Sequence, residues 1–197
     1  MTAFDPVPRV SGVAAPLLRD NIDTDAIIPS REIKGVGKTG LAEGLFAGWR
    51  YLQGREPDPG FVLNDPLYAH APILLGGTNF GCGSSREHAV WALHEYGVRA
   101  VIAPGFAPIF ASNCVRNGVI PVVLPAEVIA TFKDTVTIDL VGQTVMSGGA
   151  CVAFDIDPEA RAMLVDGLDA IGLTLTNLPA IAAFHAADRV ARPWIYL

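Results

Sequence analysis

The alternation of hydrophobic and polar positions along this chain predicts short strands and helices that follow one another in sequence. Between residues 9 and 18, Val10, Val13 and Leu17 are separated by small residues, which predicts a strand. Because only short connections join the elements that follow residue 73, we expect parallel strands linked by right-handed crossovers. Those elements are a buried strand at 73–75, a helix at 85–96, a strand at 98–103, a helix at 108–117 and a strand at 119–124.

An irregular segment precedes this core and an antiparallel unit follows it. Residues 30–72 are rich in Gly, Pro and Asp and lack a regular period, which is typical of a functional or interfacial connection. The chain is long enough for one domain, which we expect to span residues 1–197. The later elements expected are a helix at 126–133, a hairpin of alternating segments at 136–140 and 152–156 around a turn at 142–143, and helices at 158–165 and 178–187.

Composition narrows the class of protein. Apolar residues make up 51% of the chain, which is enough for a packed core. The formal net charge of -6 argues against a nucleic-acid surface, because the phosphate backbone requires clustered Lys and Arg. No apolar run approaches the roughly 20 residues of a membrane-spanning helix, and the N-terminus lacks a basic-then-apolar signal pattern. We therefore expect a cytoplasmic protein that does not bind a membrane.

The cysteines predict neither a disulfide framework nor a metal site on this chain. There are three of them, at wide spacing and without a C-x-x-C pair. Cys114 and Cys151 are expected to be small buried residues. Cys82 lies between two glycines, where it is either a neighbour of a functional site or a small side chain that the turn tolerates.

The segment 79–89, with the sequence NFGCGSSREHA, is the strongest candidate for a functional site. Its glycines predict a turn that leads into a helix, whose first N–H groups are unpaired and whose dipole favours an anion. The guanidinium of Arg86 adds a planar fork that matches a carboxylate. Ser84 and Glu87 have the spacing of a capping box, with Ser85 as an alternative cap. The segment therefore predicts a site that holds a small anion against a serine.

Three common motifs are excluded by single residues. Arg86 stands where the dinucleotide-binding pattern G-x-G-x-x-G requires its third glycine. Neither Ser84 nor Ser85 is followed two residues later by the glycine of a nucleophile elbow. Glu32 occupies the first glycine position of the phosphate-binding loop that residues 37–39 would otherwise complete.

In four segments the chain resembles the small subunits of isopropylmalate dehydratase, a family related to the C-terminal swivelling domain of aconitase. Segment 79–89 resembles the active-site loop of the aconitase superfamily, and the sequence NIDTDAIIP at 21–29 is similar to the opening signature of the family. Segments 103–121 and 166–175 are similar to two further family blocks. The resemblance implies an α/β fold, a three-layer β/β/α swivelling domain with a parallel strand–helix–strand core and an antiparallel C-terminal hairpin.

The resemblance also implies a reaction and a partner. The family interconverts 2-isopropylmalate and 3-isopropylmalate through isopropylmaleate, in leucine biosynthesis, with a [4Fe–4S] cluster whose open iron acts as a Lewis acid. The cluster belongs to the large subunit, so this chain is expected to bind no metal and to act on its small hydroxy-dicarboxylate substrate only with that partner. Two alternatives stay open: a related hydro-lyase of the homoaconitase or methylmalate/citraconate type, and a non-catalytic anion- or RNA-binding module.

By resemblance, Ser84 is the catalytic base, acting as an alkoxide, while Ser85 and Arg86 bind a substrate carboxylate. The alternative for Ser84 is a helix cap alone. Lys34 is a candidate substrate-binding residue or a solvated lysine, in a loop at 30–38 that departs from the family because Glu32 stands where an aromatic residue is common.

Six further residues are expected as neighbours of the site. Thr24 and Asp25 either orient a proton shuttle or only cap a turn. His88 either forms a hydrogen-bonded pair near the site or is a buried structural histidine. The full set of expected neighbours is Thr24, Asp25, Asn79, Gly81, Gly83 and His88.

Overall fold

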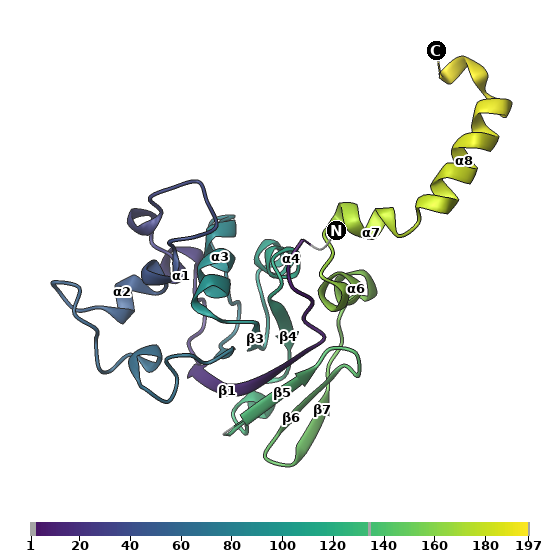
Figure 1. Ribbon diagram of the computed structural model, residues 1–197. Helices are drawn as coiled ribbons and strands as arrows, with labels where there is room; N and C mark the ends of the chain where they lie inside the picture. The colour runs from purple at the N-terminus through teal and green to yellow at the C-terminus, as the bar shows by residue number, and fades with distance from the viewer. Residues whose placement is uncertain (1–2, 134, 197) are drawn as a thin grey trace.

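The structure, a computed structural model, describes residues 3–133 and 135–196. Within these ranges its centre is a seven-stranded mixed sheet in the order β4-β3-β2-β1-β5-β6-β7 (Figure 1). The parallel strands are β1 (Arg9–Leu17), β2 (Ile73–Gly76), β3 (Ala100–Ala103) and β4 (Ile120–Val123). The sheet continues in the antiparallel sense through β5 (Thr135–Asp139), β6 (Thr144–Ser147) and β7 (Ala150–Ala153).

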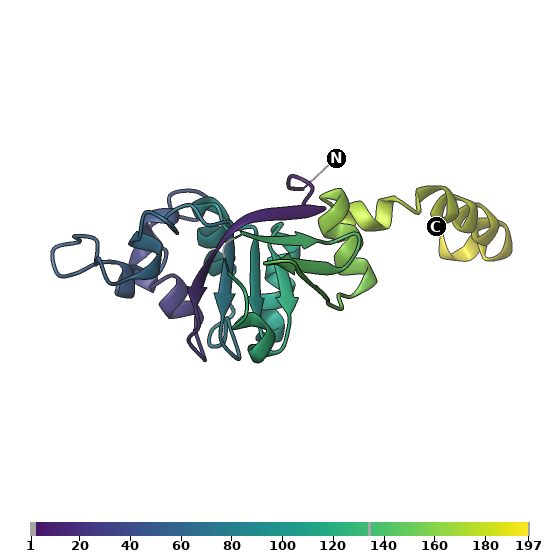
Figure 2. The same ribbon diagram turned by 90° about the horizontal axis from the view of Figure 1, so that it is seen from below.

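The long strand β1 joins the two halves of the sheet. Residues 14–17 pair in parallel with β2, whereas residues 9–13 pair in the antiparallel sense with β5. Figure 2 shows β1 bending as it passes from the antiparallel half to the parallel half. The sheet is therefore one continuous, curled structure.

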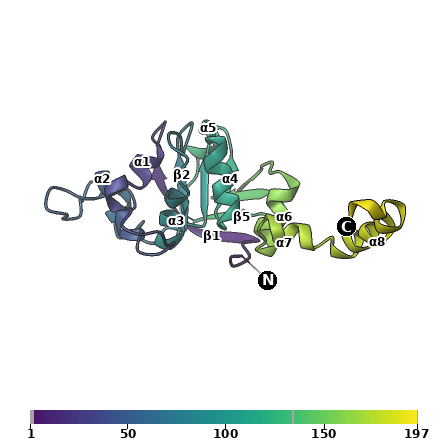
Figure 3. The same cartoon turned by 90° about the horizontal axis from the view of Figure 1, so that it is seen from above.

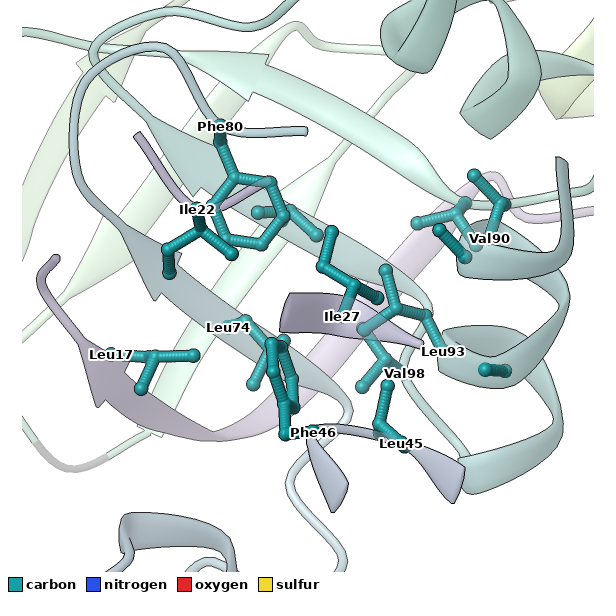
Figure 4. Packing of buried hydrophobic residues seen from close by; sticks show 14 of the residues in the cluster. Leu17, Ile22, Ile27, Leu45, Phe46, Leu74, Phe80, Val90, Leu93 and Val98 are labelled. Carbon is teal, nitrogen blue, oxygen red and sulfur yellow. The ribbon is translucent and has the colours of Figure 1, made fainter. Parts of the chain in front are cut away.

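The two faces of the parallel half pack against different layers. Side chains alternate across a strand, so Ile73 and Leu75 share one buried core with Ile138 of β5, which places the antiparallel half over this face. Leu74 belongs to the other core, which it shares with Val90 and Leu93 of helix α3 (Glu87–Tyr96) (Figure 4). Helix α4 (Pro108–Arg116) contributes to the same core. The expected β/β/α order of layers is confirmed, and the two β layers are halves of one curled sheet.

The irregular segment between β1 and β2 supplies much of the helix-side core. Phe46, Phe61 and Leu63 of this segment are buried in that core. The ring centroids of Phe46 and Trp49 lie 5.8 Å apart. Its elements are short helical turns: α1 (Thr24–Ile27), α2 (Ala47–Arg50), and the 3₁₀ turns η1 (Ser30–Glu32), η2 (Ala42–Gly44) and η3 (Val62–Asn64). The interfacial role expected of residues 30–72 stays a prediction.

Most predicted elements appear with nearly the bounds expected, but the start of α3 was wrong. The helix begins at Glu87, with Arg86 as an extended N-cap residue (φ -118°) and without a side-chain cap. The expected capping box does not form, because the Glu87 carboxylate accepts a hydrogen bond from Asn117 Nδ2 at 2.7 Å. Ser84 is therefore not a helix cap. The helix expected at 126–133 is also shorter, α5 (Ala126–Ile129).

The C-terminal region differs from the prediction in two ways. The two strands expected to form a hairpin do not pair with each other, because an additional strand, β6, lies between them. Strand β5 pairs with β6, and β6 pairs with β7 after the turn at Gly148–Gly149. Helix α7 (Ala170–Leu175) was not expected, because Gly172 and Thr174 weaken its helical pattern. The other helical elements are α6 (Pro158–Asp166), α8 (Leu178–Ala191) and the 3₁₀ turn η4 (Pro193–Ile195).

The C-terminal helices project from the sheet (Figures 1 and 3). Neither α7 nor α8 has a buried residue, and large apolar side chains such as Phe184 and Trp194 are exposed. Among the described residues, no helix combines the length and apolarity needed to cross a membrane.

Candidate active site

The connections that follow β2 and β3 are bonded side by side, and they build the site. The backbone N–H of Phe80 donates to the carbonyl of Gly105 at 2.9 Å, and that of Ala107 donates to the carbonyl of Phe80 at 3.0 Å. The ring of Phe80 also packs against Phe110, with centroids 5.5 Å apart. Together these contacts bring the turn 79–86 against the start of α4, at the carboxyl ends of the parallel strands, where such sheets bind ligands.

Two glycines are required for this close approach. Gly81 has φ +77°, and a Cβ there would lie 2.1 Å from Cγ of Phe110. Gly83 has φ +89°, and its Cβ would lie 3.3 Å from Cβ of Asp23. A side chain at either position would strain the backbone, and at residue 81 it would also force the turn away from α4.

The opening segment at 21–25 holds the other side of the turn. The N–H of Gly81 donates to the carbonyl of Ile22 at 2.7 Å, and the N–H of Thr24 donates to the carbonyl of Cys82 at 2.9 Å. The hydroxyl of Thr24 then donates to the carbonyl of Ser84 at 2.8 Å. Thr24 is thus a neighbour of Ser84, and its side chain fixes the serine backbone.

Asn79 supports the same turn from its other end. It adopts a left-handed conformation (φ +57°), and its Nδ2 donates to Oδ1 of Asn21 at 2.9 Å.

Arg86 and Asp25 form an ion pair that the sequence analysis did not anticipate. The guanidinium contacts both carboxylate oxygens, with Nη2 at 3.0 Å from Oδ2. The hydrogen bond from Arg86 holds the pKa of Asp25 below its ordinary value, although desolvation opposes this shift. The side chain of Arg86 is only 20% exposed, whereas that of Asp25 is 58% exposed. The guanidinium of Arg86 is therefore paired with a carboxylate that is itself largely open to solvent.

A small pocket of about 90 Å³ lies between this turn and α4. Ser84 and Ser85 are exposed at its wall, and neither hydroxyl makes a hydrogen bond to another described residue. Thr24, Gly81, Gly83 and Arg86 line the same wall, facing the first turns of α4 with Ile109, Phe110 and Asn113. The structure thus brings most expected site residues together.

Lys34 and His88 lie outside the lining of this pocket. Lys34 is exposed in the loop after η1. The ring of His88 packs against Trp91, with centroids 4.7 Å apart. A substrate contact of Lys34 and a site role of His88 stay predictions.

One face of α3 carries a polar network that the sequence analysis missed. Glu87, Trp91 and Glu95 are spaced by four residues and so share a face. The Asn117 amide oxygen accepts from Trp91 Nε1 and from Lys38 Nζ, each at 3.0 Å, so that Asn117 links Lys38 to Glu87. This link ties the loop at 34–40 to the first turn of α3.

The carboxylate of Glu95 anchors the end of the same loop. It accepts the backbone N–H groups of Gly40, Leu41 and Ala42 at 2.5 to 2.9 Å. Burial opposes ionisation, but these three donors hold the pKa of Glu95 below its ordinary value. The loop that carries Lys34 is thus fixed at its C-terminal end, at residues 40–42.

The cysteines do not form a metal site within the described chain. Cys82 is half-buried in the active-site turn, Cys114 is buried and Cys151 is exposed on β7, so the expectation that Cys151 is buried was wrong. Burial raises the pKa of the Cys114 thiol, which keeps it protonated. Among the described residues, no three His, Cys, Asp or Glu side chains are placed to hold a metal ion.

Comparisons with known proteins agree with this geometry. The family model described as the aconitase C-terminal domain matches residues 5–127. A protein of Cupriavidus necator named 3-isopropylmalate dehydratase small subunit is 58% identical over 98% of this chain and 99% of its own length. The chain belongs to this small-subunit family. A protein of the same name from Xanthobacter autotrophicus is 47% identical over 94% of the chain and 97% of its own length.

A solved structure of a family member confirms the fold. The 3-isopropylmalate dehydratase of Methanocaldococcus jannaschii superposes with a TM-score of 0.69 at 29% identity. The match covers 89% of this chain and 99% of that one. The family resemblance inferred from the segments 21–29 and 79–89 is therefore confirmed, and the name of the relatives implies that they work with a larger subunit.

Proposed function

We propose that this chain is the small subunit of a 3-isopropylmalate dehydratase, which interconverts 2-isopropylmalate and 3-isopropylmalate through isopropylmaleate. The observation that carries this proposal is the meeting of Ser84, Ser85 and Arg86 in one pocket, in a chain 58% identical to a protein of that name. The whole chain would act as one swivelling domain against a large subunit. The [4Fe–4S] cluster that we assign to that subunit would supply Lewis-acid chemistry for the departing hydroxyl.

In this proposal Ser84 removes the proton from the substrate carbon. Its hydroxyl is exposed in the pocket and makes no hydrogen bond to another described residue, so it is available to a ligand. A serine can act as a base only where its alkoxide is stabilised, and the nearby guanidinium of Arg86 supplies positive charge. Asp25 neutralises part of that charge. We therefore propose that a substrate carboxylate displaces Asp25 from Arg86, or shares the fork with it, before the proton is transferred.

The departure of Glu32 from the family pattern does not place a free charge at the pocket. Glu32 departs from the usual family pattern, but it is only 9% exposed and forms an ion pair with Arg55 at 3.0 Å. Its charge is therefore neutralised by Arg55 and is not directed to the pocket, whose lining residues do not include it. The substitution gives no support to a hydro-lyase that binds a charged branch, as a homoaconitase-type enzyme would.

Mixing the chain with a cluster-bearing large subunit tests the proposal. We expect no turnover by the chain alone and interconversion of the two isopropylmalates by the mixture, followed by the absorbance of the unsaturated intermediate. Homoaconitate-type and methylmalate-type acids should react more slowly. A mixture that is inactive on isopropylmalate, or that prefers one of the other acids, would contradict the proposal.

Arg86→Lys tests the role of the guanidinium in the same mixture. A lysine cannot reproduce the two-pronged contact, so we expect kcat/KM to fall about 10- to 100-fold, the range for losing a hydrogen bond to a charged group. Arg192→Lys is the matched control, because Arg192 forms a similar ion pair with Asp188 in the projecting C-terminal region. Equal kinetics in the two variants would remove Arg86 from the substrate site.

A further inference from the structure

Asn117 is the buried centre of the polar network beside α3, and it is only 7% exposed. Its Oδ1 accepts from Trp91 Nε1 and from Lys38 Nζ, each at 3.0 Å. Its Nδ2 donates to the Glu87 carboxylate at 2.7 Å and to the carbonyl of Asn113 at 2.9 Å. The amide thus uses both its acceptor and its donor positions. A buried polar network whose members are all satisfied holds the elements that it joins rigidly.

Two opposite charges orient this amide. The ammonium of Lys38 lies on its oxygen side, 5.3 Å from the centre of the Trp91 ring, and the carboxylate of Glu87 lies on its nitrogen side. An aspartate at residue 117 would place two carboxylates together, and an alanine would remove both bonds. The network therefore requires a side chain with an acceptor at one end and a donor at the other.

The network reaches the active-site turn through Glu87. This residue is the first of α3 and follows Arg86 directly. The carbonyl of Arg86 accepts from the N–H of Ala89 at 3.2 Å, so the backbone of Arg86 belongs to the same first turn. That turn has no side-chain cap, and the bond from Asn117 gives it a side-chain anchor. One amide at the end of α4 thus holds the turn of α3 that presents the guanidinium.

We propose that Asn117 is a positioning residue for Arg86, which it aligns with the substrate carboxylate by holding Glu87 and the first turn of α3. The inference rests on the proposed function, in which Arg86 binds that carboxylate. Asn117 does not line the pocket, so it acts on the substrate only through these neighbours. The bond from Lys38 keeps the amide in the orientation that offers Nδ2 to Glu87.

The kinetics of Asn117→Asp in the assembled enzyme test this role. The variant keeps an acceptor for Lys38 and Trp91 but opposes the Glu87 carboxylate with a like charge. We expect KM and the competitive inhibition constant of an alkylsuccinate to rise about 10- to 100-fold, the effect of a small misplacement of a binding group, with a smaller change in kcat. A merely structural role would lower kcat through loss of folded enzyme and leave both constants unchanged. That result would overturn the proposal.

An exchange variant and a matched control complete the kinetic test. Combining Asn117→Asp with Glu87→Gln restores the contact with donor and acceptor exchanged and keeps the net charge of the pair, so both constants should return close to the parental values. Asn64→Asp is the control, because the Asn64 amide makes similar bonds with Arg50 and Asp58 and does not line the pocket. It should change neither constant. A failure of the exchange variant to recover, or an equal rise in the control, would overturn the proposal.

A measurement on the chain alone separates this inference from the proposed function. Because Arg86 is paired with Asp25, a displaced guanidinium changes the titration of that carboxyl. Carbon-13 NMR should show the pKa of Asp25 rising toward its ordinary value in Asn117→Asp and returning in the exchange variant. This result without isopropylmalate turnover in the mixture would support the positioning role while the proposed function fails. An active parent enzyme, with neither the pKa nor KM changed in Asn117→Asp, would overturn the positioning role alone.

Discussion

Replacing Gly81 with alanine tests how the fold positions the serine turn. The left-handed conformation (φ +77°) costs a residue with a side chain about 1–2 kcal/mol. The new Cβ would also lie 2.1 Å from Cγ of Phe110, and overpacking of this kind costs about 1–3 kcal/mol. We therefore expect Gly81→Ala to lower the free energy of unfolding by about 2–5 kcal/mol. Turnover should fall as well, because relief of the clash moves Ser84 away from α4.

Urea unfolding, followed by circular dichroism, measures this loss against two glycine controls. Gly83→Ala has the same backbone strain but a milder contact of 3.3 Å, so its loss should be about 1–2 kcal/mol. Gly35→Ala places its Cβ in open space and should change stability by less than about 1 kcal/mol. If Gly81→Ala is as stable as Gly35→Ala, the close approach of the turn to α4 is refuted.

A double-mutant cycle separates the clash from the backbone strain. Phe110→Ala alone removes a buried ring and should cost about 3–5 kcal/mol. In the variant that combines it with Gly81→Ala, the clash is absent. The combined loss should therefore be smaller than the sum of the single losses by about 1–3 kcal/mol. Strict additivity would show that the side chain at residue 81 never meets the ring.

Two further predictions concern charge and the C-terminal region. The hydrogen bond from Arg55 lowers the pKa of Glu32 against the effect of burial, so this pair stabilises the fold above the ordinary pKa of 4.5 and ceases to do so as the pH falls below it. Glu32→Gln should thus lower the Tm at pH 7 by a few degrees, about 1 kcal/mol, and by less as the pH approaches 3; an equal loss at both pH values would contradict this. Deleting residues 170–197 should change the free energy of unfolding by less than about 1 kcal/mol, since α7 and α8 bury no residue, and a calorimetric Tm more than about 5 °C lower would show that they pack on the sheet.

The parallel core was predictable from sequence because its signals are local. The buried strand at 73–76 and the helix that ends at Gly97 are defined by apolar runs and by a glycine with φ +114°. The third antiparallel strand was missed because β6 is only four residues long and has a single large buried apolar side chain, Val145. The register of β1, which pairs in two senses, depends on strands more than 50 residues away and leaves no local pattern.

The residues of the candidate site could be predicted from sequence, but their hydrogen-bond and ion-pair partners could not. The glycines and serines of 79–89 carry their own conformational and chemical signature. The partner of Arg86 does not, because Asp25 lies 61 residues earlier. The spacing of Ser84 and Glu87 predicted a capping hydrogen bond for Glu87. Its carboxylate instead accepts a hydrogen bond from Asn117, 30 residues later in the chain. Tertiary contacts therefore decide which polar groups remain free for a ligand.

The assignment of Ser84 as the base is tested by comparing Ser84→Ala with Ser85→Ala in the assembled enzyme. A positioned general base contributes about 10²- to 10⁴-fold to the rate. We predict that Ser84→Ala lowers kcat by at least about 100-fold, with the inhibition constant of an alkylsuccinate unchanged. Ser85→Ala should weaken inhibitor binding and largely retain kcat. A Ser84→Ala enzyme whose kcat stays within tenfold of the parent would show that Ser84 is not the base.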